Sequence, residues 1–206
     1  MTKTDLINAM NALSARRNAF WSEADFQFEL AQELYTMFPT AQIRLERPFG
    51  VVSSRNRLYV DIVVELNGVS HLIELKYKTK TATITDINGE QIILQNHSAH
   101  DFGCYDYLKD VSRIEQLKQN NNNLKNGFAI ILTNDSSYYT PKSGAAYDMF
   151  RIHQGATKSG KLNWLPTRKG TLLAYGNRHN FSLLGSYTMD WLLYNNDFRY
   201  LITEIV

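Results

Sequence analysis

The chain has 206 residues, of which 44% are hydrophobic and 12% aromatic, and this is enough apolar material for one packed domain. Its formal net charge of +2 permits a polyanionic partner without requiring one. The single cysteine, Cys104, excludes an internal disulfide and is typical of a reducing compartment. The sequence shows no N-terminal signal and no apolar run of about 18 residues, so a cytoplasmic protein is expected.

Two helices are predicted before the first strand. Apolar residues recur at helical spacing over residues 4–18, which predicts the first helix. A second helix is expected to begin at Ser22, whose side chain can cap it, and to end before Pro39. Residues 41–49 are then expected to form a strand.

Residues 57–78 are the most informative segment, because they read as two alternating strands joined by a tight turn. The dipeptide Asn67-Gly68 between them is typical of a two-residue type I′ turn. Such a turn fixes the register, and this register places Asp61 of the first strand directly opposite Glu74 of the second. One face of the hairpin is almost entirely apolar and is expected to face the core. The two acids lie on the other face.

Two carboxylates that face each other in a sheet need a partner. Like charges at opposed positions are destabilising by up to about 1 kcal/mol, and aspartate is depleted in strands. Lys76 lies on the same face, two residues from Glu74. A divalent cation would offset the repulsion, because Mg²⁺ prefers one or two carboxylates together with waters and a phosphate oxygen. The alternative is a solvated hairpin face on which Lys76 and Lys78 neutralise the acids.

The segments after the hairpin predict a crossover connection. Residues 79–103 are mixed in character and are expected to form an insertion or a long connection. Residues 104–119 predict a helix, on which Asp110 and Arg113 are interpreted as an exposed surface pair. The continuous apolar run at 127–133 predicts a strand that is buried on both faces. A helix followed by such a strand implies a mixed sheet with helices packed on it.

The remainder of the chain, residues 134–206, alternates short apolar segments with turns and is assigned to the same single domain as a C-terminal elaboration. Its basic stretch at 158–170 surrounds Trp164 and is a candidate for phosphate contacts. His97 and His100 have no cysteine or third histidine nearby. Hydrogen bonding within a loop is therefore expected for them rather than a metal site.

The order of the elements and the position of the acids resemble the PD-(D/E)XK nuclease superfamily, which has the restriction-endonuclease-like fold. The resemblance rests on Asp61, twelve intervening residues and then Glu74-Leu75-Lys76. It covers about residues 22–133. It implies an α/β (α+β) fold in which a mixed sheet has an αβββαβ core.

One position departs from the family's pattern. Val60 stands where the family's name has a proline. The proline of the motif is not a ligand, so this departure leaves the implied chemistry in place.

The resemblance also implies a metal site and the roles of its residues. Asp61 and Glu74 would hold Mg²⁺ or Mn²⁺, with the main-chain carbonyl of Leu75 as a further ligand. Lys76 would position the attacking water and stabilise negative charge as it develops on the phosphate.

A glutamate on the first core helix often assists the metal in this family. Glu23 is the best match here, and Gln27 lies beside it one helical turn later. Glu29 and Glu33 on the same helix stay open as alternatives.

Contacts to nucleic acid are expected from basic residues that flank the hairpin, namely Arg57, Lys78 and Lys80. For each of these residues, scattered surface charge is an equally good interpretation.

The leading functional hypothesis is a Mg²⁺-dependent endonuclease that acts on DNA in restriction, defence or genome maintenance, with a homodimer as its assembly by analogy to the family. One alternative is a non-catalytic module on the same fold that binds nucleic acid or protein. Another is a metal-dependent phosphohydrolase of small nucleotides. Strandedness, DNA against RNA, and endonuclease against exonuclease action stay open at this stage.

Overall fold

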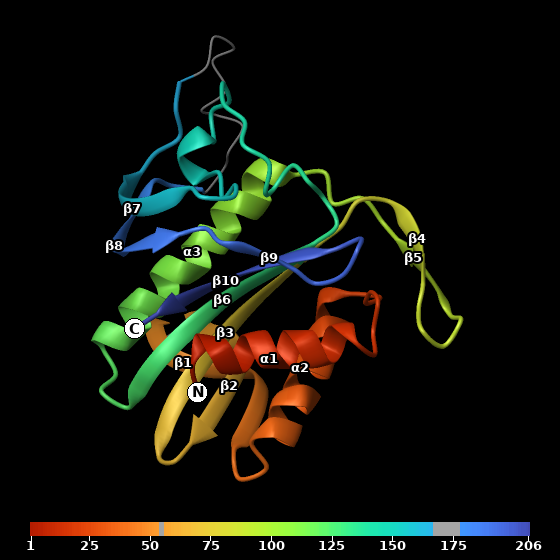
Figure 1. Cartoon of the computed structure of the whole chain (residues 1–206). Coiled ribbons are helices and arrows are strands. Elements are labelled where there is room, and N and C mark those ends of the chain that lie inside the picture. The colour runs from red at the N-terminus through yellow and green to blue at the C-terminus, as the bar shows by residue number, and fades with distance from the viewer. Residues whose placement is uncertain (54–55, 167–177) are drawn as a thin grey trace.

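The computed structural model describes residues 1–53, 56–166 and 178–206, and the side chains within 50–58 lie outside that description. A mixed six-stranded sheet is at the centre of the molecule (Figure 1). Its strands are β1 (Gln42–Ser53), β2 (Asn56–Leu66), β3 (Val69–Lys78), β6 (Leu124–Thr133), β9 (Trp191–Leu193) and β10 (Arg199–Ile205). They are arranged in the order β1-β2-β3-β6-β10-β9. The expected fold class, a mixed sheet combined with helices, is confirmed.

Helices cover both faces of this sheet. They are α1 (Lys3–Ser14), α2 (Glu23–Met37) and α3 (His100–Gln119). Helices α1 and α2 pack on one face, and α3 packs on the other (Figure 1). The first helix ends earlier than predicted, because the N–H groups of Arg16 and Arg17 both bond to the carbonyl of Leu13 in a closing turn. No helix within the described ranges is long and apolar enough to cross a bilayer.

The β2–β3 hairpin has the predicted turn and register. Asn67 and Gly68 both have positive φ, at 52° and 79°, as a type I′ turn requires. The antiparallel pairs run from Leu66 opposite Val69 to Ile62 opposite Ile73. The ladder therefore stops one residue short of Asp61 and Glu74, where the two strands begin to separate.

Strand β6 follows α3 and pairs with β3 in parallel, as the crossover predicts. Phe128, Ile130 and Leu132 pack towards α1 and α2. Ala129 and Ile131 pack towards α3. The prediction of a strand that is buried on both faces is confirmed, and β3, which carries Glu74 and Lys76, lies in the interior of the sheet.

The segment 134–206 contributes to the central sheet as well as to its periphery. Strand β10 pairs antiparallel with β6, and β9 pairs with β10. Two further elements, β7 (Thr157–Leu162) and β8 (Phe181–Thr188), form a separate hairpin whose second strand packs against α3 (Figure 1). A short 3₁₀ helix, η1 (Asp148–Phe150), packs against α3 and β7.

The predicted insertion at 79–103 contains a two-stranded hairpin of β4 (Ala82–Thr85) and β5 (Gln91–Leu94). It projects from the end of β3 beyond the central sheet (Figure 1). Ile92 and Leu94 are buried, whereas Ile93 between them is exposed.

The stretch 158–170 was a candidate for phosphate contacts, but two of its residues are buried. Trp164 is buried and its ring stacks on Tyr105, with centroids 5.5 Å apart. Lys158 is also buried, and its ammonium donates to the carbonyl of Met149 at 3.0 Å. Residues 167–170, which include Arg168 and Lys169, lie outside the described part of the chain.

Candidate functional site

The candidate site lies at the point where β2 and β3 separate. Asp61 Oδ2 accepts a hydrogen bond from the N–H of Leu75 at 2.6 Å, and Glu23 Oε2 accepts one from the N–H of Tyr77 at 2.7 Å. In an unbroken ladder these alternate N–H groups of β3 would bond to β2. Two carboxylates therefore accept the hydrogen bonds along the side of β3 that faces β2. One carboxylate comes from β2 and the other from α2.

Helix α2 places Glu23 and Gln27 beside this edge. Ser22 caps the helix by accepting from the N–H of Asp25 at 3.1 Å, so Glu23 occupies the first helical position. Gln27 lies one turn later and is buried. Its amide donates to the carbonyl of Asp61 at 2.6 Å and to Glu46 at 2.9 Å. Gln27 thus uses its two amide protons on different partners and links the backbone of Asp61 to the side chain of Glu46.

Glu46 is a residue that the sequence-based prediction missed. Its neighbours on β1 pair with Ile62 and Val60, so Glu46 lies opposite Asp61 in the register. Its φ of 49° lies in the left-handed region, which few non-glycine residues occupy and which is often found at functional sites. No local sequence signal marks this conformation.

Glu74 is covered by α3 and is 2% exposed. Its carboxylate forms an ion pair with Arg113. Asp110 contacts Arg113 at 3.2 Å and also contacts the ammonium of Lys76 at 2.8 Å. The four side chains form a chain of alternating charge between β3 and α3, in which the two acids are buried and the two cations half-buried. This arrangement is incompatible with a solvated hairpin face at Glu74.

The prediction that Asp110 and Arg113 are an exposed surface pair is wrong. The two side chains do contact each other, but Asp110 is buried and faces the sheet. A signal for this burial was present in the sequence. Asp110 lies three residues after Tyr107 and four before Ile114, and both of these are in the core.

Lys76 connects the side of β3 that holds Asp61 with the charged side chains on α3. Its ammonium donates to the carbonyl of Leu75 at 2.9 Å, in addition to its contact with Asp110. The structure therefore brings together the carboxylate of Asp61, the carbonyl of Leu75 and the ammonium of Lys76 at one edge of β3. Glu74 is linked to them through Lys76, Asp110 and Arg113, and its side chain engages a different partner from that of Asp61.

The cluster carries more negative than positive groups. Its members are the carboxylates of Glu23, Asp61, Glu74 and Asp110 and the cations Lys76 and Arg113. Burial raises the pKa of Asp61, and the charges of Asp110 and Glu23 add to this effect. Burial, followed by the charge of Asp110, also raises the pKa of Glu74 well above its ordinary value.

The charge of Lys76 is secured by its neighbours. Burial alone would lower the pKa of Lys76, but the carboxylates around it, with Asp110 foremost, outweigh burial and raise it. Lys76 therefore stays protonated at neutral pH.

The residues present fit a hydrated Mg²⁺ or Mn²⁺. Within the described residues, no three His, Cys, Asp or Glu side chains converge as a complete ligand set. Glu74 Oε1 and Asp110 Oδ2 are buried, and each lies within ion-pair distance of a cation but accepts no hydrogen bond of good geometry. One or two carboxylates, a carbonyl and several waters are the coordination that Mg²⁺ prefers.

The three basic residues expected to bind nucleic acid have different surroundings. Lys80 is exposed, but its ammonium forms an ion pair with Asp135 at 3.0 Å. Lys78 is half-buried and lines a pocket next to Glu23. The side chain of Arg57 lies outside the described part of the structure.

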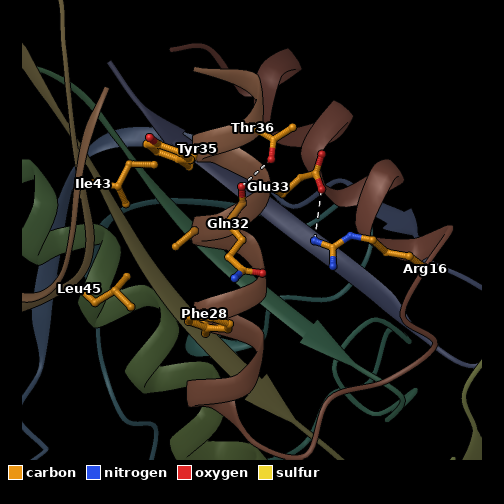
Figure 2. A pocket seen from close by; sticks show the side chains of 9 residues that line it. Arg16, Phe28, Gln32, Glu33, Tyr35, Thr36, Ile43 and Leu45 are labelled. Atoms are coloured by element: carbon orange, nitrogen blue, oxygen red, sulfur yellow. Dashed lines mark hydrogen bonds and ion pairs between the residues drawn. The ribbon is translucent and has the colours of Figure 1, made fainter. Parts of the chain in front are cut away.

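A pocket of about 560 Å³ lies elsewhere, between α2 and the edge strand β1. Figure 2 shows its lining, in which Phe28 and Tyr35 come from the helix and Ile43 and Leu45 from the strand. None of the residues of the candidate site lines it. Its size therefore says nothing about the chemistry at Asp61 and Glu74.

Comparison of the chain with family models, with curated proteins and with solved structures finds no match.

We expect the free energy of unfolding to fall as the pH rises from the ordinary glutamate pKa of 4.5 towards about 9. Across this window the folded state keeps the proton of Glu74 that the unfolded state has lost, so raising the pH favours unfolding. Urea denaturation at several pH values measures the slope. Glu74→Gln should flatten it, whereas Glu90→Gln, at an exposed glutamate, should not. An unchanged slope in Glu74→Gln would assign the pH dependence to other groups.

Proposed function

We propose that this protein is a Mg²⁺- or Mn²⁺-dependent nuclease that hydrolyses phosphodiester bonds of DNA, with an endonuclease mode of action. The observation that carries the proposal is the charge balance of the cluster. If all four carboxylates were ionised, they would exceed the two cations by two negative charges beside β3, and the raised pKa values of Asp61 and Glu74 reflect the cost of that ionisation. One divalent cation would balance them.

In this proposal, some side chains of the cluster hold the cation and others stabilise the charge that develops on the phosphate. Asp61, the carbonyl of Leu75 and Glu74 would hold the cation. When bound, it would supply Lewis-acid activation of water and neutralise charge on the phosphate. Lys76 remains protonated beside these groups and would stabilise the negative charge that develops on the phosphoryl oxygens. Asp110 holds the ammonium of Lys76 in place for this task.

The supporting residues have roles of their own. Gln27 fixes the backbone of Asp61, and Glu23 stands at the adjacent position of the β3 edge, where it can orient waters of the cation. Lys78 and Lys80 would contact neighbouring phosphates. We place this activity in the cytoplasm, in restriction, defence or genome maintenance, and a homodimer would let two such sites cut two strands.

The test measures cation binding and cleavage separately. Calorimetric titration with Mn²⁺ should show binding to the wild type and its loss in Asp61→Asn, a variant whose amide oxygen can still accept from Leu75. Circular plasmid and circular single-stranded DNA should be cut in Mg²⁺ or Mn²⁺ and stay intact in a chelator. Asp197→Asn, at an exposed aspartate, is the matched control.

Each outcome has a defined meaning. If the wild type leaves both circular substrates intact with either metal, endonuclease action on DNA is refuted. Degradation of linear DNA alone would indicate an exonuclease. Binding of DNA that is indifferent to chelator and to Asp61→Asn would instead favour a non-catalytic binding module.

A further inference from the structure

A second pocket, of about 280 Å³, opens beside the candidate site. It is formed by the start of α2, the end of β3 and strand β5 of the projecting hairpin. Its lining includes Trp21, Glu23, Lys78, Thr79, Ile93 and His97. Glu23 belongs to both places, because its carboxylate bonds to the β3 edge next to Asp61 and its side chain also lines this pocket.

Two large apolar side chains in this pocket are exposed. Trp21 before α2 is 52% exposed, and Ile93 on β5 is 58% exposed. The other tryptophans of the chain, Trp164 and Trp191, are buried. Because both side chains line the same pocket, they form adjoining exposed apolar surface of the kind found in ligand-binding grooves, and this favours a flat apolar ligand.

The polar groups of the pocket are fixed by the backbone. The N–H of Thr79 donates to Nδ1 of His97 at 3.1 Å, so Nδ1 carries no proton. Burial and the charge of Lys78 lower the pKa of His97, which keeps the ring neutral. The proton of the neutral ring therefore resides on Nε2, which leaves that N–H as a donor for a ligand.

Lys78 adds a positive charge to the same pocket. It is half-buried, and it forms no ion pair with the residues that the structure describes. Lys78 is also two residues from Lys76 on the same strand, so the two ammonium groups belong to the same face of β3. Lys76 and Lys78 can therefore contact two successive phosphates of one nucleic-acid strand, one phosphate at each lysine.

We propose that this pocket binds one unstacked nucleobase of the strand that is cut, with Trp21 as its stacking platform. The inference rests on the proposed nuclease function and adds to it the form of the substrate. Aromatic side chains that stack on bases, together with a basic groove, are the usual means of holding single-stranded nucleic acid. A base in a duplex is stacked and paired, so it enters such a pocket only when the strand is open. The substrate is therefore single-stranded DNA or a locally opened duplex.

The test measures binding in a chelator, so that it depends neither on the cation nor on cleavage. Three probes are used, namely a short single-stranded oligodeoxynucleotide, its duplex and an abasic oligonucleotide with the same backbone. Because the other tryptophans are buried, quenching of the intrinsic fluorescence reports on Trp21. We expect quenching by the single strand, little by the duplex or the abasic strand, and its loss in Trp21→Phe.

Affinity is measured by anisotropy of a labelled oligonucleotide. Trp21→Ala should weaken single-strand binding by about tenfold or more. Tyr35→Ala, at an exposed aromatic residue on α2 that lines the other pocket, should not. Equal quenching by the abasic strand, or wild-type affinity in Trp21→Ala, would overturn the base-binding pocket even if cleavage is observed. Quenching and Trp21 dependence without any cleavage would retain the pocket and reject the nuclease.

Discussion

Lys76→Gln is expected to reduce cation-dependent cleavage by about 100- to 1000-fold, because removal of a single charge-stabilising donor from an active site typically has an effect of this size. Its affinity for Mn²⁺ should equal or exceed that of the wild type, since the ammonium no longer competes for the carbonyl of Leu75 and for Asp110. The measurement combines single-turnover cleavage of DNA with calorimetric titration of the cation.

A matched control separates this effect from a general loss of positive charge. Lys125→Gln removes an exposed lysine from β6, the neighbour of β3 in the sheet, and should leave both quantities unchanged. If Lys76→Gln loses cation binding together with cleavage, the lysine has a structural role in the cluster. Cleavage at the wild-type rate would remove Lys76 from the proposed chemistry.

Arg113→Met is expected to lower the free energy of unfolding by about 3 kcal/mol, because it leaves the buried carboxylates of Glu74 and Asp110 without one of their two cations. The guanidinium is partly exposed, which places the effect at the lower end of the range for broken buried ion pairs. Urea denaturation above pH 9, where Glu74 is ionised in the folded protein, measures the loss. The double variant Arg113→Met/Glu74→Gln should recover most of it, because the uncompensated charge has been removed.

The same variant tests whether the cluster accepts a cation. Saturating Mn²⁺ should stabilise Arg113→Met by more than it stabilises the wild type, since the ion replaces the lost positive charge and binds only the folded state. Equal stabilisation of the two proteins would mean that Arg113 and the cation do not compete for the same carboxylates. A double variant as unstable as Arg113→Met would show that packing, and not charge, explains the loss.

The parts of the fold that could be predicted are those with local causes. The Asn67-Gly68 turn sets the hairpin register through the φ preferences of two residues, and that register follows from the turn alone. The apolar run of β6 requires burial on both faces wherever it lies in the sheet. These local constraints were sufficient to place Asp61 and Glu74 at neighbouring positions on adjacent strands.

The parts that could not be predicted depend on contacts between distant segments. The ladder ends before Asp61 because carboxylates from β2 and α2 cap the N–H groups of β3, and no pattern within the hairpin encodes this. Strand β10 finds its partner β6 about 70 residues away in the chain, and its pairing has no local signature. Asp110 is buried against the prediction because its apolar neighbours at helical spacing pack against the sheet and its charge is balanced there by Lys76 and Arg113.

The parallel pairing of β3 with β6 has a consequence for the order in which the chain can assemble. The β2–β3 hairpin needs contacts between near neighbours alone, so it can form while its acids are still fully hydrated. The acids lose their water when the crossover closes and α3 docks, which requires the closure of a much longer loop. A nascent chain therefore has the two acids in place early but anchors Lys76 late, so that the charged cluster is completed only when the whole fold has formed.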